Sequence, residues 1–129
     1  ARIRELGPRL ESLYRDIIRR TGSRLLVATY PRLFAADGSR DDCRWLDTAS
    51  QLRMVAAGAA LNAEILRRAA AAGATGVDAF DAFAGHELCT RHPMFVKVSA
   101  LRGLLAYSAH PNSRGQQVLA RLVAQALPG

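Results

Sequence analysis

The spacing of apolar residues predicts three amphipathic helices separated by shorter apolar runs. From about residue 6 to residue 21, apolar side chains recur every three or four positions, with arginines and acids between them. Gly22 follows this segment as a C-terminal helix stop. A long alanine-rich helix is predicted from about residue 48 to residue 72, and a final helix from about residue 113 to residue 127.

Two apolar runs of strand length lie between the predicted helices. Residues 24–31 are apolar on both faces and end at Pro31, which is typical of a parallel strand covered by helices on each side. Residues 76–80 predict a second, shorter strand. The alternation of helix and strand predicts an α/β fold with parallel strands and right-handed crossovers. We therefore expect functional groups on the long loops after the strands, residues 32–47 and 81–107.

The predicted sheet is narrow for an independent domain. Parallel sheets need both faces covered, and few stable ones have only two strands. The pattern therefore favours the second half of a doubly wound domain. Composition agrees with a globular fold, because a chain of 129 residues that is 50% hydrophobic can bury a core. The chain begins at Ala1 rather than at a methionine, so we expect an upstream segment to have been removed or left out.

The net charge of +7 suits a polyanion, but its distribution does not indicate a binding groove. Nearly all the positive charge is arginine, Lys97 being the only lysine, and it is spread along the chain. Such spreading is more typical of a solvated helix face than of a nucleic-acid groove, so we predict no nucleic-acid partner. We also predict no transmembrane segment, because no run of about 20 apolar residues occurs.

His110 is the candidate for chemistry. Pro111 holds the residue before it out of the α region, and Asn112 or Ser113 can cap the helix that follows. An imidazole at such a loop rim is a common general base, since it titrates nearest to neutrality. The same His-Pro pair could also be a polar turn ahead of a helix, and no convincing nucleophile accompanies it. Asp37-Gly38-Ser39 has the composition of a turn rather than of a nucleophile block.

Five short blocks in a fixed order decide between these interpretations. They are Thr29-Tyr30-Pro31-Arg32-Leu33-Phe34, Leu61-Asn62, Val77-Asp78-Ala79-Phe80, Gly85-His86-Glu87-Leu88-Cys89 and Ser108-Ala109-His110-Pro111-Asn112-Ser113-Arg114-Gly115-Gln116. Together they resemble the carboxyl-terminal half of SGNH hydrolases, the GDSL esterase and lipase family, especially secreted actinobacterial-type members. The resemblance covers essentially the whole chain.

This resemblance implies a flavodoxin-like three-layer α/β/α sandwich, with residues 1–129 as the carboxyl-terminal part of one domain. It implies hydrolysis of a small-molecule or lipid ester through a serine acyl-enzyme, with His110 as the base and no cofactor or metal. The family's serine, glycine and asparagine blocks have no counterpart here. We therefore expect them on an amino-terminal half or a second chain, and we expect the 129 residues alone to be inactive. Family members of this type imply a secreted or extracytoplasmic protein.

The sequence departs from the usual family pattern before the histidine. Tyr107 stands where the family usually has an aspartate, three residues before His110. Some members resemble this arrangement and use a main-chain carbonyl instead, which predicts that the Tyr107 carbonyl orients His110. Tyr30 and Phe34 could line an acyl pocket, although packing is the default role for aromatic residues there.

The loops carry two further features with more than one interpretation. His86 and Glu87 are adjacent, but they lack a third metal ligand at suitable spacing, so a structural hydrogen bond inside the loop is favoured for both. Cys43 and Cys89 would be free thiols in the cytosol. In a chain that resembles secreted esterases, we predict instead a disulfide that closes a loop and contributes roughly 4 kcal/mol in the chain-entropy model.

Two other function classes stay open at the level of sequence. A truncated, non-catalytic homologue could bind a partner chain or a second copy of itself through the apolar surface where missing strands would dock. An arginine-dependent polyanion binder is the weaker alternative.

Overall fold

The computed structural model confirms the predicted order of elements. It describes residues 2–38, 45–96 and 108–127. The elements are α1 (Arg2–Thr21), β1 (Leu26–Ala28), α2 (Thr48–Ala71), β2 (Thr75–Val77) and α3 (Ser113–Gln125). No helix in these three ranges is both long enough and apolar enough to span a bilayer.

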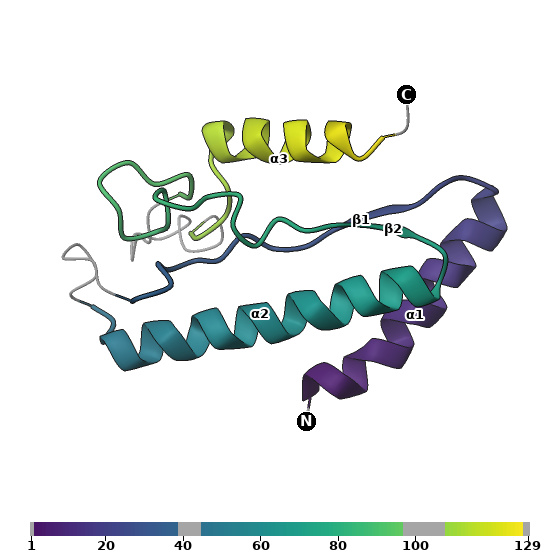
Figure 1. The fold of residues 1–129 in the computed structure, drawn as a ribbon, viewed down its shortest axis with the longest axis horizontal. Coiled ribbons are helices and arrows are strands. Elements are labelled where there is room, and N and C mark those ends of the chain that lie inside the picture. The colour runs from purple at the N-terminus through teal and green to yellow at the C-terminus, as the bar shows by residue number, and fades with distance from the viewer. Residues whose placement is uncertain (1, 39–44, 97–107, 128–129) are drawn as a thin grey trace.

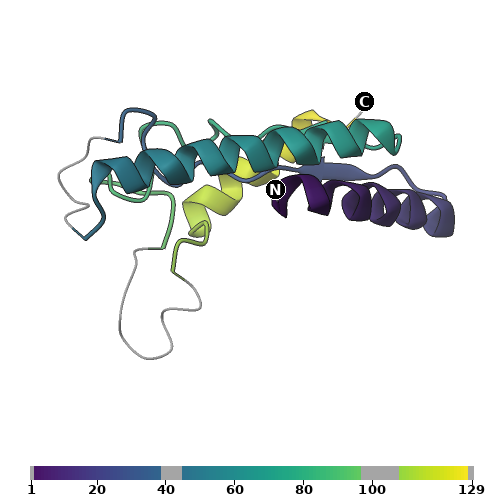
Figure 2. The same ribbon diagram turned by 90° about the horizontal axis from the view of Figure 1, so that it is seen from below.

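The described elements form three layers around a parallel pair of strands. β1 and β2 pair in parallel, with Leu26 opposite Thr75 and Ala28 opposite Val77. Figure 1 shows α2 on one side of this pair and α3 on the other, and the view from below in Figure 2 shows α1 lying beside α2. The chain is therefore an α/β protein with the parallel sheet that the sequence predicts.

The strands are shorter than predicted, although their positions are right. Each has three residues, in place of the eight and five expected. Hydrogen bonds between the two segments continue past the strand ends, from Thr29 N to Val77 O and from Arg32 N to Phe80 O. Pro31 has no amide hydrogen and cannot donate a hydrogen bond, so the ladder is interrupted between these two hydrogen bonds. β1 is also half-buried or exposed rather than covered on both faces.

The helix boundaries follow from local capping chemistry. Asp47 caps α2 by accepting from Ser50 N at 2.8 Å, and Asn112 caps α3 by accepting from Gly115 N at 3.0 Å. Gly22 ends α1 with a φ of +62° and a bond from its N to Ile18 O. α1 begins four residues earlier than predicted, and α3 ends two residues earlier.

Ion pairs fasten α1 to α2. Arg68 on α2 donates to Glu11 on α1 at 2.7 Å and to Glu64 at 2.8 Å. Hydrogen bonds from Arg67 and Arg68 hold the pKa of Glu64 below its ordinary value, and those from Arg68 and Arg15 do the same for the pKa of Glu11. Charged side chains therefore form part of the contact between the two helices.

The main hydrophobic cluster lies at the carboxyl ends of the strands, and loops supply it. Its buried members are Phe34, Phe83, Leu88, Cys89, Met94 and Phe95. The rings of Phe83 and Phe95 meet edge to face, with centroids 5.0 Å apart. Val55 of α2 and Val118 of α3 pack against this cluster from the two outer layers. The core therefore supports the loops where the sequence predicts function.

Gly115, in the first turn of α3, allows this helix to approach the loop closely. A β-carbon at this position would lie 2.4 Å from the backbone oxygen of Met94 and 2.9 Å from the ring of Phe83. We expect Gly115→Ala to lower the free energy of unfolding by about 1–3 kcal/mol, because the backbone or a core ring must move. Urea denaturation of the 129-residue chain measures this loss.

Gly58→Ala in α2 is the matched control. Its nearest neighbour would be Phe80 at 3.8 Å, an ordinary contact distance. Alanine favours a helix interior over glycine by about 1 kcal/mol, so this variant should be as stable as the original chain or more so. A similar loss in both variants would contradict the close approach at Gly115.

Candidate functional site

A cavity of about 360 Å³ opens at the carboxyl ends of the strands. Its walls are residues 30–33 after β1, one face of α2, Phe80 and Phe95 from the second loop, and residues 109–111 before α3. These are the loops gathered at the end of the sheet where α3 begins (Figure 1). Most of the lining is apolar, and the exposed His110 contributes an imidazole. An apolar hollow with few polar groups is the usual form of a small-molecule site.

Backbone hydrogen bonds hold His110 on both sides. Its carbonyl accepts from Val96 N at 2.7 Å, and the preceding Ala109 donates its N–H to Val96 O at 3.0 Å. Ala109 itself has a φ of 61°, a left-handed conformation that costs a non-glycine residue roughly 1–2 kcal/mol. The short antiparallel bridge between Phe95 and Pro111 thus fixes the direction in which the chain presents the histidine.

Asn112 ties this histidine segment to the second loop. Its side-chain oxygen caps α3, and its amide nitrogen donates to the carbonyl of Pro93 at 2.9 Å. Its backbone N–H donates to Met94 O at 2.9 Å. The sequence indicated only the cap. The contacts to the loop were missed because nothing in the local pattern shows that residues 93–96 run beside residues 109–112.

Tyr30 lines the cavity, whereas Phe34 does not. Tyr30 is 64% exposed, and the buried Asn62 of α2 holds its backbone by two hydrogen bonds, 3.2 Å to the N–H and 2.7 Å to the carbonyl. Phe34 is buried in the hydrophobic cluster, with its ring centroid 6.4 Å from that of Trp45. Packing, the default role of an aromatic residue here, accounts for Phe34.

A buried ion pair joins the two loops. Arg32, after β1, donates through Nε and Nη2 to one oxygen of Glu87, at 3.1 and 3.0 Å. Its third contact is Asp81, whose side chain is 71% exposed, whereas that of Glu87 is 2% exposed. The other oxygen of Glu87 is buried and has no hydrogen-bond partner within the described ranges. This pair fixes one wall of the cavity, because Arg32 belongs to its lining.

One of the two hydrogen bonds that the sequence favoured lies inside the second loop, and the other reaches across to the first loop. His86 Nδ1 lies 2.9 Å from the carbonyl oxygen of His92, and Glu87 is held by Arg32. The prediction of a hydrogen bond inside the loop is therefore confirmed for His86, whereas for Glu87 the partner is Arg32 of the first loop rather than a residue of its own loop. Within the described residues, no three histidine, cysteine or acidic side chains are grouped so that they could hold a metal ion.

Two of the predicted site residues lie outside the described ranges. They are Tyr107, whose carbonyl was expected to orient His110, and Cys43, the expected partner of Cys89. Cys89 is buried in the hydrophobic cluster, and the described part of the chain contains no free cysteine. The roles of the Tyr107 carbonyl and of the cysteine pair remain predictions.

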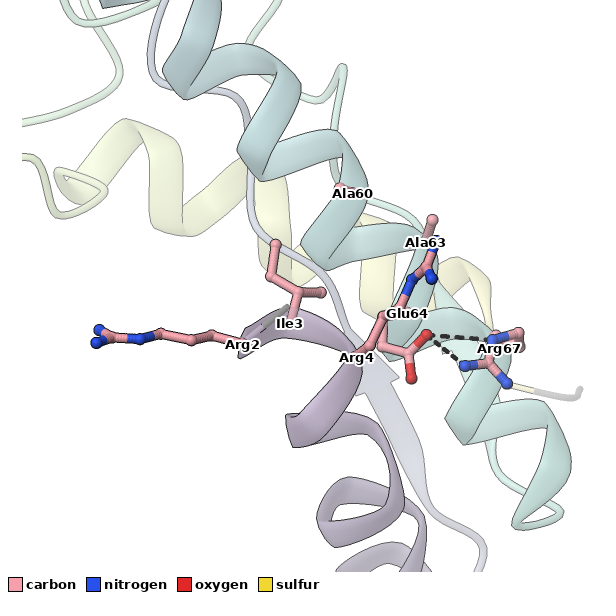
Figure 3. Close-up of a pocket in the computed structure, with 7 residues that line it drawn as sticks. All are labelled: Arg2, Ile3, Arg4, Ala60, Ala63, Glu64 and Arg67. Carbon is pink, nitrogen blue, oxygen red and sulfur yellow. Dashed lines mark hydrogen bonds and ion pairs between the residues drawn. The ribbon is translucent and has the colours of Figure 1, made fainter.

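A wider pocket of about 660 Å³ lies elsewhere, between the start of α1 and the middle of α2. Figure 3 shows Glu64 turned toward Arg67, to which it is bonded, whereas Arg2 extends away from the other labelled side chains. The pocket is open, and its acidic group is already paired with arginine. It contains neither a histidine nor a hydroxyl or thiol nucleophile, so it does not offer the chemistry of the cavity at His110.

Comparison with known proteins identifies the kind of fold. No protein-family model and no curated protein matches the chain. Among solved structures, it is similar to an extracellular lipase from Streptomyces rimosus, with a TM-score of 0.82 and 30% identity, over 95% of this chain and 51% of that one. It is also similar to a phospholipase A1 from Streptomyces albidoflavus NA297, with a TM-score of 0.80 and 27% identity over the same shares of the two chains.

The chain therefore has a lipase-like α/β fold and spans about half the length of these two enzymes. The resemblance found in the sequence is confirmed at the level of this fold.

The two carboxylates on Arg32 allow a matched test of the buried joint. We expect Glu87→Gln to lower the free energy of unfolding by about 3 kcal/mol, because it removes the inner charge that balances a mostly buried guanidinium. Asp81→Asn removes an exposed partner of the same arginine, and it should change stability by no more than about 0.5 kcal/mol. Urea denaturation of both variants gives the comparison. Equal losses would show that burial does not distinguish the two contacts.

Proposed function

We propose that this chain is the histidine-bearing part of an SGNH-type serine esterase or lipase. The observation that carries the proposal is that His110 lies at the rim of an apolar cavity, on a lipase-like fold. The reaction would be the hydrolysis of a carboxylic ester through a serine acyl-enzyme. No cofactor enters this mechanism.

In the proposed mechanism, His110 acts as the general base. Its Nε2 takes the proton of a serine hydroxyl as that oxygen attacks the ester carbonyl, and the imidazolium then protonates the leaving alcohol. The same histidine activates water to release the acid. The Tyr107 carbonyl accepts a hydrogen bond from Nδ1–H and thereby fixes the tautomer. A neutral carbonyl stabilises the imidazolium less than a carboxylate would, so hydrolysis by this dyad should be slower than hydrolysis by a full triad.

The serine and the oxyanion donors would come from an amino-terminal half or from a second chain. The sheet supports such an addition, because within the described residues each of its two strands has only one neighbour. Leu13, on α1, is 52% exposed and offers further apolar area for a partner. The backbone at an unpaired strand edge can accept another strand. Secretion is part of the proposal, since the lipase from S. rimosus is extracellular.

The same two observations favour the second candidate, a non-catalytic module that binds a partner through this edge. It differs from the esterase in two respects. Its partner would lack a nucleophilic serine, and His110 could be replaced without loss of binding.

The first experiment tests the base. The 129-residue chain alone should not hydrolyse p-nitrophenyl butyrate above background, because the nucleophile and oxyanion donors are absent. Combined with a polypeptide that carries the GDS serine block, it should show turnover that His110→Ala reduces by at least about a thousandfold. Release of p-nitrophenol measures the rate.

Two variants serve as controls for that experiment. Tyr107→Phe keeps the backbone carbonyl and should retain activity. His92→Ala alters an exposed histidine outside the cavity lining and should retain it too. Turnover by the chain alone that depends on His110 would contradict the proposed location of the nucleophile. Loss of activity in Tyr107→Phe as complete as in His110→Ala would contradict the role of the carbonyl.

A disulfide between Cys43 and Cys89 is part of the proposal, because it would join the two loops that frame the cavity. We expect the denatured, unreduced protein to show no reactive thiol with Ellman's reagent, and two after reduction. The burial of Cys89 in the hydrophobic cluster is consistent with this pairing. Two reactive thiols before reduction would refute it.

A further inference from the structure

Gly58 interrupts a run of alanines in the middle of α2. The local sequence is Ala56-Ala57-Gly58-Ala59-Ala60, and the helix continues through it without a break. Glycine in a helix interior is less favourable than alanine by about a factor of five in equilibrium terms, since it has more backbone freedom to lose. Local helix chemistry therefore gives no reason for a glycine at this position.

The other glycines in the described ranges each have a structural reason, and Gly58 has neither of those reasons. Four have a positive φ: Gly22, Gly38, Gly73 and Gly85. Three more stand where a β-carbon would come within 3.0 Å of another atom: Gly7, Gly76 and Gly115. At Gly58 the backbone is helical, and the nearest atom to a β-carbon would be Phe80 Cε2 at 3.8 Å.

The space at Gly58 belongs to the cavity. Gly58 lines it together with Val55 and Leu61, which lie one turn before and one turn after it on the same face of α2. A β-carbon at Gly58 would meet Phe80 at an ordinary contact distance of 3.8 Å, so the glycine leaves room for a methyl group in an apolar wall of the cavity. Arg32, the permanent charge in the lining, is already paired with Glu87 and Asp81. The wall at α2 therefore suits an uncharged aliphatic chain.

We propose that Gly58 sets the length of the aliphatic chain that the cavity accepts. The acyl chain of the ester lies along the Val55, Gly58 and Leu61 face of α2, with its carbonyl end toward His110. A side chain at residue 58 would occupy part of this face of the cavity, here called the groove, and would shorten the space open to the acyl chain. The proposal rests on the proposed esterase function for the identity of the ligand, but the groove itself can be tested without catalysis.

The test measures the binding of octanoate and dodecanoate to the 129-residue chain by isothermal titration calorimetry. The ratio of the two affinities cancels the attraction of the positive chain for any carboxylate, because both probes carry the same charge. In the original chain, dodecanoate should bind more tightly than octanoate. Each methylene group that loses its place in the groove should weaken binding about fourfold.

Three variants separate the groove from general effects on the helix. Gly58→Leu should reduce the preference for dodecanoate by about tenfold or more, and Gly58→Ala by a few-fold. Ala56→Leu is the control, because Ala56 is exposed and lies roughly on the opposite side of the helix. It should leave the ratio unchanged. Gly58→Ala keeps the test decisive if the leucine variant does not fold, since alanine favours the helix.

Two results would overturn the proposal. One is that the original chain binds octanoate and dodecanoate equally well or binds neither of them. The other is a ratio that stays the same in Gly58→Ala and Gly58→Leu, or that changes as much in Ala56→Leu. The proposed function has a different failure: chain-length selection at Gly58 would persist while the serine-bearing combination showed no His110-dependent turnover. Conversely, His110-dependent turnover with no effect at Gly58 would reject only the role of the glycine.

Discussion

The Arg32–Glu87 ion pair is the contact on which the arrangement of the site depends. It joins the loop after β1 to the loop after β2, and both partners are largely withdrawn from water. Removing two charges from water is costly, so the pair is favourable only when its hydrogen bonds are well formed. Two donors of Arg32 meet one oxygen of Glu87, which satisfies part of that requirement. The two loops are thereby held in one relative position at the end of a very short sheet.

This joint explains how a sheet of two three-residue strands can support a cavity. The strands bury little apolar area, and β1 is half-buried or exposed along its length. The buried apolar side chains instead come from the loops, with Phe83 and Phe95 at the centre of the cluster. α3 is bound to the same cluster through Gly115 and Asn112, and the strained Ala109 lies between this anchor and the loop. Packing around the loops therefore positions His110 more directly than the sheet does.

The parts of the fold that could be predicted are those determined by local chemistry. Asp47 and Asn112 are good caps, and the helices they start begin where the sequence indicated. The predicted strands have the right positions but are too long. An apolar run does not reveal that the hydrogen-bond ladder between the strands is interrupted at Pro31. Structural roles for His86 and Glu87 followed from the lack of a third ligand. Arg32 as the partner of Glu87 could not be predicted, since 55 residues separate them and no local pattern relates them.

Some residues of the site could likewise be predicted from the sequence, and others could not. His110 could be singled out because a proline and a helix start surround it, and Tyr30 because it follows a strand. Gly58 could not be singled out, because its role depends on the distances to the residues that surround it in the folded chain. A glycine such as Gly115 permits neighbours that would lie within 3 Å of a β-carbon, whereas at Gly58 the nearest neighbour, Phe80, would lie at 3.8 Å and the position lines the cavity. The same residue type thus serves opposite purposes on two helices that flank one core. Only the distances around each position distinguish a packing glycine from one that shapes a binding surface.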